Sequence, residues 1–165
     1  MADLLECLVQ IRALAETVGR LTRLAAAFPG EAWSRHGTAW PDGSALDVLA
    51  RMTEEEIAVG VRLWDSLTPL SPRRSRPTAP ERSLACSPDT AHTLDRFAAQ
   101  RRNTLELLGA CSANDLALKV PDPERAEFQV ADLVAEMLAR DTDHLGEIFQ
   151  RLSSTVAFKS TDGEY

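Results

Sequence analysis

Apolar side chains recur every three or four residues over four long segments of this chain, and this spacing constrains its fold more than any other feature. Such a period places the apolar side chains along one face of an α-helix. No segment shows the sustained two-residue alternation of a half-buried strand, so we expect no sheet. Four amphipathic helices in one chain predict an all-α, up-and-down four-helix bundle with long connecting loops. The expected helices cover about residues 2–28, 44–67, 88–111 and 128–152.

Local signals indicate where these helices begin and end. Pro29-Gly30 ends the first helix. The stretch S-A-L-D, residues 44–47, reads as a capping box at the start of the second helix, because a Ser is followed by an acid three residues later. Ser87 is the expected cap of the third helix, with Pro88 in the first helical position. The first helix is expected to bury a face made by Leu4, Leu8, Ile11, Ala15, Val18, Leu21, Ala25 and Phe28.

At 165 residues the chain has the size of one domain, which we expect to cover residues 1–153, with a flexible tail over 154–165. A net charge of −7 argues against nucleic acid as a partner, because phosphate binding needs a concentrated positive surface. No run of about eighteen apolar residues occurs, so no membrane partner is expected. The three cysteines lack metal-ligand spacing and are expected to be reduced thiols, which indicates a cytoplasmic protein.

Two of the expected apolar faces are interrupted by polar or charged side chains. Arg140 and His144 lie four residues apart on a line of the 128–152 helix that is otherwise apolar. Arg51 and Glu55 interrupt a line of the 44–67 helix in the same way. Burying an unpaired charge costs several kcal/mol, so these groups are expected to be paired or to line a water-filled cleft. The sequence therefore predicts an Arg- and His-lined pocket between the second and fourth helices.

Two patches of this sequence resemble the DinB-like (damage-inducible B) superfamily of four-helix-bundle proteins. The first is S-A-L-D-V-L-A-R, residues 44–51. The family pattern there has a Ser, then Val-Leu, then a His seven residues after the Ser, and Arg51 stands at the His position. The second is R-D-T-D-H-L-G-E-I, residues 140–148, where the family reads His-Asp-x-x-His-Leu-x-x-Ile. The order and separation of the patches also agree, so the resemblance covers nearly the whole domain.

The resemblance implies a divalent-metal site, usually zinc or nickel, which typical members build from three histidines on the second and fourth helices. In this chain those positions are Arg51, Arg140 and His144. A guanidinium group stays protonated and has no lone pair for a cation, so we predict that the usual metal does not bind and that there is no cofactor. The resemblance then favours a non-metal binding or interaction module of uncharacterised role. It also implies a homodimer, since members commonly pair through helix faces.

Two interpretations of the arginines remain open. Asp47 and Glu55 are each four residues from Arg51, and Glu136 is four residues from Arg140, the spacing at which helical side chains meet. On the first interpretation these carboxylates neutralise the arginines within the chain. On the second, the two guanidinium groups grip a small anionic ligand such as a carboxylate or a phosphate.

Further residues and one further activity belong to the same expected site. Asp141 is expected to cap a helix or to pair with an arginine, and Glu55 alone of the acidic run 54–56 is expected to face inward. The alternative function is an enzyme of the DinB-like type, a thiol transferase or a hydrolase. Its His144 would act with the two arginines on an anionic substrate, or would hold a different ion together with Glu55 and Asp47.

Overall fold

The computed structural model describes residues 4–36, 43–67, 89–122, 125 and 128–157. Within these ranges the chain is helical and contains no strand, which confirms the all-α expectation. An isolated bridge joins Lys119 and Gln129. The helices are α1 (Leu4–Ala27), α2 (Gly30–Ser34), α3 (Ala45–Leu67), α4 (Thr90–Gly109), α5 (Ala113–Leu116) and α6 (Val130–Ala157).

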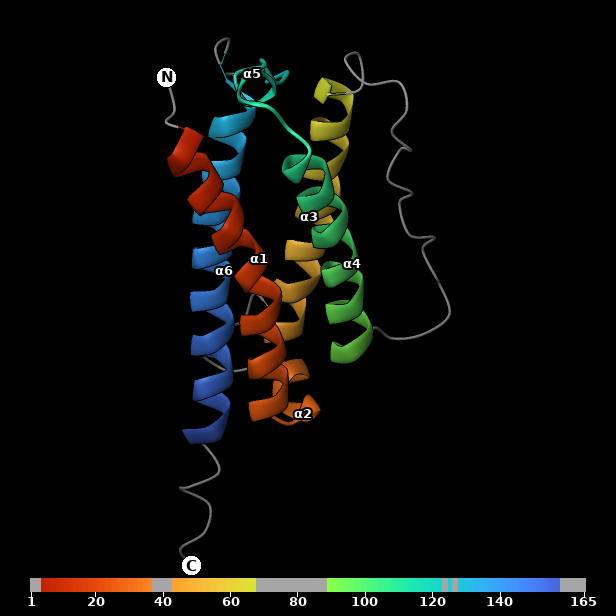
Figure 1. Ribbon diagram of the computed structural model, residues 1–165. Helices are drawn as coiled ribbons and strands as arrows, with labels where there is room; N and C mark the ends of the chain where they lie inside the picture. The colour runs from red at the N-terminus through yellow and green to blue at the C-terminus, as the bar shows by residue number, and fades with distance from the viewer. Residues whose placement is uncertain (1–3, 37–42, 68–88, 123–124, 126–127, 158–165) are drawn as a thin grey trace, which may run out of the picture.

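The four long helices α1, α3, α4 and α6 lie side by side (Figure 1). Helices α1 and α3 each pack against both α4 and α6, so α1 and α3 lie on opposite sides of the group. The short helix α2 contacts α3 and α6, and α5 contacts α6. This arrangement places α3 beside α6, which are the two helices that carry the expected pocket.

Helices α3 and α4 run in the same direction, so the expected up-and-down order is wrong at this step (Figure 1). Glu56 pairs with Arg101, and a Cβ atom on Gly60 would lie 3.7 Å from Thr104 Oγ1, so residue numbers rise together along the two helices. The 68–88 interval is long enough to permit this direction, which a short hairpin link would not. An extended chain covers up to about 3.5 Å per residue, which is enough to return along a helix of about 35 Å.

The predicted start of α3 is confirmed, whereas the start of α4 differs. Ser44 Oγ accepts a hydrogen bond from Asp47 N at 3.3 Å, and the Asp47 carboxylate accepts one from Ser44 N at 2.6 Å, which completes the capping box. The N-cap of α4 is Asp89, whose carboxylate accepts from His92 N at 2.7 Å. The expected cap, Ser87, lies outside the described residues.

Three other boundaries depart from the expected ones. Helices α2 and α5 form inside the segments 29–43 and 112–127, which were expected to be links. Helix α6 continues to Ala157 rather than ending near residue 152. Residues 154–157, expected in the tail, are therefore helical, and the remainder of that tail lies outside the described residues.

The face that α1 buries also differs from the expected one. Leu4 and Leu8 were expected inside but are 44% and 52% exposed, and Ala15 is exposed as well. The first turns read L-L-E-C-L-V over residues 4–9 and are apolar at every position except Glu6, so the helical period does not select one face there. The buried residues of α1 are Cys7, Leu14, Thr17 and Leu21.

The buried apolar side chains form two clusters, and polar residues lie between the clusters along each long helix. We call Thr17, Glu56, Arg101 and Asp141 the polar layer; each is at most 5% exposed. The flanking core residues on the four helices are Leu14 and Leu21, Met52 and Val59, Phe97 and Leu107, and Met137 and Ile148.

Candidate functional site

Arg101, in the middle of α4, is the buried cation of the polar layer and is only 1% exposed. Its Nη1 and Nη2 donate to the two carboxylate oxygens of Asp141 at 2.6 and 2.9 Å, in a bidentate pair. Nη2 also donates to Glu56 Oε2 at 2.8 Å, and Nη1 donates to the Leu14 carbonyl at 3.1 Å. Thr17 Oγ1 donates to Asp141 Oδ2 at 2.6 Å. The polar layer therefore takes one side chain from each long helix.

The electrostatics of the polar layer keep Arg101 charged. Burial by itself lowers the pKa of a guanidinium, because the charged form loses its water. The hydrogen bonds and negative charges of Asp141 and Glu56 outweigh burial, so the pKa of Arg101 is raised above its ordinary value. The expected pairing of Asp141 with an arginine is thus present, and its partner belongs to α4.

His144 on α6 lies between carboxylates of two helices. Its Nε2 is 3.0 Å from Glu55 Oε2 on α3, and its Nδ1 is 3.8 Å from Glu147 Oε2 on α6. Glu147 also pairs at 2.5 Å with Arg51 and at 2.5 Å with Arg151. A chain of alternating acidic and basic groups therefore runs along the seam between α3 and α6.

Arg140 is neutralised one helical turn away, as the four-residue spacing predicted. Its Nη2 lies 2.5 Å from Glu136 Oε1, and Arg125 joins the same carboxylate at 3.1 Å. Arg125 also stacks 3.8 Å from the ring centre of Phe128. Burial raises the pKa of Glu136, but the two guanidinium groups lower it further, so this pKa lies below its ordinary value.

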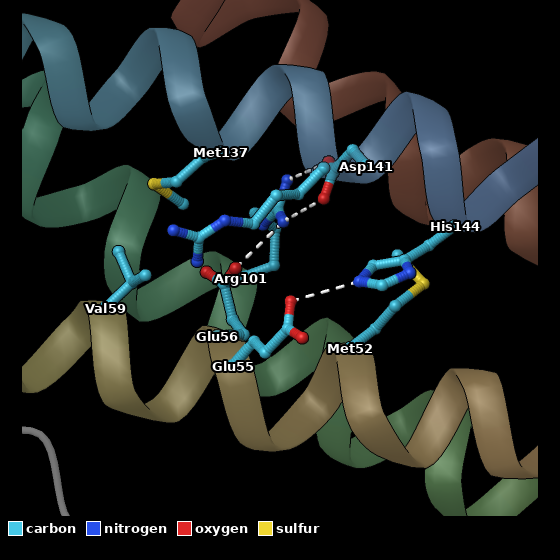
Figure 2. A pocket seen from close by; sticks show the side chains of 9 residues that line it. Met52, Glu55, Glu56, Val59, Arg101, Met137, Asp141 and His144 are labelled. Atoms are coloured by element: carbon cyan, nitrogen blue, oxygen red, sulfur yellow. Dashed lines mark hydrogen bonds and ion pairs between the residues drawn. The ribbon is translucent and has the colours of Figure 1, made fainter.

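A small hollow lies beside the polar layer, between α3 and α6 (Figure 2). Its volume is about 20 Å³, which is room for about one water molecule. Figure 2 shows the His144–Glu55 contact on one side of the hollow and the Arg101–Asp141–Glu56 contacts next to it. The lining residues are Met52, Glu55, Glu56, Val59, Arg101, Met137, Arg140, Asp141 and His144.

Four of the six expected pocket residues line this hollow, and Arg51 and Asp47 do not. The side chain of Arg51 is 49% exposed and pairs with Glu147 rather than with Asp47 or Glu55. Asp47 is exposed, and its carboxylate caps the start of α3 through Ser44. The expectation that Arg51 interrupts the core is therefore wrong.

A shift of one residue on α3 explains this difference. From Val48, helical steps of three and four residues run either through Arg51 and Glu55 or through Met52 and Glu56. Met52 is 3% exposed and Glu56 is 4% exposed, so the second path faces the core. The expectation that Glu55 alone faces inward is wrong as well, because Glu56 is buried while Glu55 is half-buried.

Sequence reasoning missed Arg101, although a signal for it exists. Arg101 lies four residues after Phe97 and seven before Leu108, and both of these apolar residues are buried. The third expected helix therefore has an interrupted apolar line of its own. The carboxylate partners, Glu56 and Asp141, lie on other helices, where no spacing rule connects them to Arg101.

No protein-family model matches the chain, and neither a curated protein nor a solved structure is detectably similar to it. Among the described residues, no group of three His, Cys, Asp or Glu side chains is placed to hold a metal ion. No helix in the described ranges is both long and apolar enough to cross a membrane. We therefore infer what the site can do chemically from the contacts and distances of its own residues.

The three-histidine metal site implied by the family resemblance does not fit the donor atoms present. Arg51 and Arg140 offer no lone pair, and each is paired with a carboxylate. The Nε2 of His144 is engaged with Glu55. What the site offers instead is an imidazole–carboxylate pair beside a buried ion-pair network.

Proposed function

We propose that this chain is a DinB-like four-helix bundle that acts as a non-metal binding or interaction module. Internal ion pairs occupy the positions at which members of that family coordinate a metal. The observation that carries this proposal is that all three positions lie along the α3–α6 seam, each beside a carboxylate of the same chain. The pairs are Arg51 with Glu147, Arg140 with Glu136, and His144 with Glu55.

The geometry of the seam supports the family resemblance as well as the departure from it. Arg51 and His144 approach the same oxygen, Glu147 Oε2, at 2.5 and 3.8 Å. Arg140 and His144 line the same hollow. His144 is therefore close to Arg51 across the two helices and one turn from Arg140 on α6, which is consistent with the arrangement that the resemblance implies.

The same contacts argue against an anionic ligand or substrate. Around the hollow, the carboxylates of Glu55, Glu56 and Asp141 outnumber the guanidinium groups of Arg101 and Arg140. An anion would have to displace a carboxylate that already pairs with an arginine. A volume of about 20 Å³ also leaves no room for a carboxylate or phosphate compound. The proposal therefore includes no anionic ligand and no enzyme acting on one.

The partner in this proposal is a second copy of the chain, in the cytoplasm. The first turns of α1 expose a run of large apolar side chains, which a helix face of a second copy would cover. The buried free thiol of Cys7 fits a reducing compartment. The exposed residues are Leu4, Leu5, Leu8 and Val9, at 44%, 68%, 52% and 62%.

Metal analysis of the purified protein, after expression with added zinc and nickel, tests the non-metal site. We expect well below one ion per chain in the unmodified protein. A double variant, Arg51→His with Arg140→His, restores the family's three imidazoles, so we expect it to gain a bound ion. The matched control, Arg12→His with Arg20→His, changes two exposed arginines on α1 and should gain none.

Two outcomes of this experiment would contradict different parts of the proposal. One zinc or nickel ion per chain in the unmodified protein would overturn the non-metal assignment. Metal in neither the unmodified protein nor the double variant would remove the support that the seam gives to the family resemblance.

A further inference from the structure

Two buried polar atoms beside the hollow have no hydrogen-bond partner among the described protein atoms. They are Glu56 Oε1 and Arg101 Nε, and both belong to residues that line the hollow. Glu56 and Arg101 are otherwise fully engaged with each other and with Asp141. A buried polar atom without a partner costs about 1–3 kcal/mol, and more when its group is charged. Native structures therefore satisfy such atoms with protein groups or with ordered water.

The hollow has the size and the lining that an internal water needs. Its volume of about 20 Å³ exceeds the roughly 10–15 Å³ that one water molecule requires. Polar groups from α3, α4 and α6 line it, and they include Glu55 and His144 besides the residues of the two unpartnered atoms. A cavity that stays dry is lined by apolar side chains alone, whereas charged groups line this one together with Met52, Val59 and Met137.

The two unpartnered atoms also select the chemistry of the occupant. Glu56 Oε1 is an acceptor, and Arg101 Nε carries a hydrogen and is a donor. A cation would satisfy Glu56 but would face the charge of Arg101, and an anion would satisfy Arg101 but would face Glu56. A neutral molecule that both donates and accepts serves both atoms.

We propose that one internal water molecule occupies the hollow as a permanent part of the polar layer. It donates a hydrogen bond to Glu56 Oε1, accepts one from Arg101 Nε, and extends the network toward His144 and Glu55. This inference concerns the site of the proposed function but rests on the hollow and the two atoms alone. It holds whether or not the chain is DinB-like.

The test compares two substitutions that add the same methyl group on the same helix. Val59 lines the hollow, whereas Val48 is also buried but does not line it. We expect Val59→Ile to displace the water and to lower the melting temperature more than Val48→Ile does. Magnetic relaxation dispersion of solvent nuclei counts long-lived internal waters, and we expect one fewer in Val59→Ile and no change in Val48→Ile.

A crystal structure of the unmodified protein tests the same inference without any substitution. We expect a solvent peak within about 2.6–3.2 Å of both Glu56 Oε1 and Arg101 Nε. Absence of that peak, or a rise in melting temperature for Val59→Ile relative to Val48→Ile, would mean that the methyl group fills a dry void. Either result overturns the proposal.

A third measurement separates water from a cation. Melting curves in sodium, potassium, choline and magnesium chloride at matched ionic strength should coincide if the occupant is water. A melting temperature that depends on which cation is present would overturn the inference in favour of an ion at Glu56. Zinc or nickel bound to the unmodified protein is a separate result, which counts against the proposed function instead.

Discussion

At the scale of single residues, Arg101 shows how this protein keeps a cation in its interior. Its guanidinium donates to Asp141, to Glu56 and to the Leu14 carbonyl, which belong to three other helices. Because none of these partners is on α4, the contacts fix how α4 sits against its neighbours. Such a network adds little net stability, but the loss of one member leaves a buried charge uncompensated.

Arg101→Met should therefore lower the free energy of unfolding by about 3–5 kcal/mol, because Glu56 and Asp141 lose the buried cation that pairs with both of them. Urea denaturation at pH 7 measures this change. Arg102→Met is the control on the adjacent, exposed residue and should stay within about 0.5 kcal/mol of the unmodified protein.

Removing the whole charged set should cost less than removing Arg101 alone. The triple variant Arg101→Met, Glu56→Leu and Asp141→Leu leaves no charge in the polar layer, so it should recover most of the stability lost in the single variant. An Arg101→Met protein as stable as the unmodified one would contradict this role of the ion pairs.

Part of the site could be predicted from the sequence, because Arg140, Asp141 and His144 lie within a turn or two of unmistakably apolar residues on α6. The expected Glu136–Arg140 pair is present for the same local reason. The buried partners of Arg101 could not be predicted, because a contact between helices has no fixed sequence separation. The choice between Arg51 and Met52 as the inward residue also depends on how α3 is rotated against α4 and α6.

At the scale of helices, a sequence signal that corresponds to a specific hydrogen bond was sufficient to place the start of α3. The capping box at the start of α3 is the clearest case, since Ser44 and Asp47 satisfy each other's backbone groups. Helices α2 and α5 span only 5 and 4 residues, which is too short for an apolar period to appear. The inward face of α1 could not be read where apolar residues surround the helix.

The Asp47 cap makes a pH-dependent contribution to stability. Hydrogen bonds from the Ser44 backbone, and then from its side chain, lower the pKa of Asp47 below its ordinary value. Because the folded-state pKa is the lower one, the stabilisation is fully present above the unfolded-state pKa and is lost as pH falls through the folded-state pKa.

Asp47→Asn should accordingly reduce stability by only about 0.5 kcal/mol at pH 7, because solvent screens a side chain that is 58% exposed, and the difference from the unmodified protein should shrink below about pH 4. Urea denaturation of both proteins between about pH 3 and pH 7, a range that spans the ordinary Asp pKa, measures this difference. A difference that stayed constant over this range would rule out the carboxylate as the source.

At the scale of the whole molecule, the helical class could be predicted but the direction of one helix could not. An apolar period identifies the buried face of a helix and says nothing about which way the helix runs relative to its neighbours. The length of the 68–88 segment excludes a tight hairpin but is compatible with either direction of α4. The parallel packing of α3 and α4 is recorded in contacts such as Glu56 with Arg101.

The exposed apolar side chains at the start of α1 lead to a prediction about assembly. We expect sedimentation equilibrium to give the mass of two chains, and Leu5→Gln with Val9→Gln to give the mass of one, because the covered apolar area is lost. The control is Phe149→Gln, which changes another exposed apolar residue, on α6. A single-chain mass for the unmodified protein would contradict the proposed homodimer.

The polar layer affects how the protein can unfold. Thr17, Glu56, Arg101 and Asp141 each come from a different long helix, and each depends on the others for its hydrogen bonds. If one helix detaches, the remaining three are left with an exposed gap and with polar groups that have lost hydrogen-bond partners, and loss of α4 also leaves two carboxylates without their cation. Partly unfolded forms are therefore disfavoured. We expect the backbone amide protons near the polar layer in all four long helices to exchange with solvent only when the whole protein unfolds.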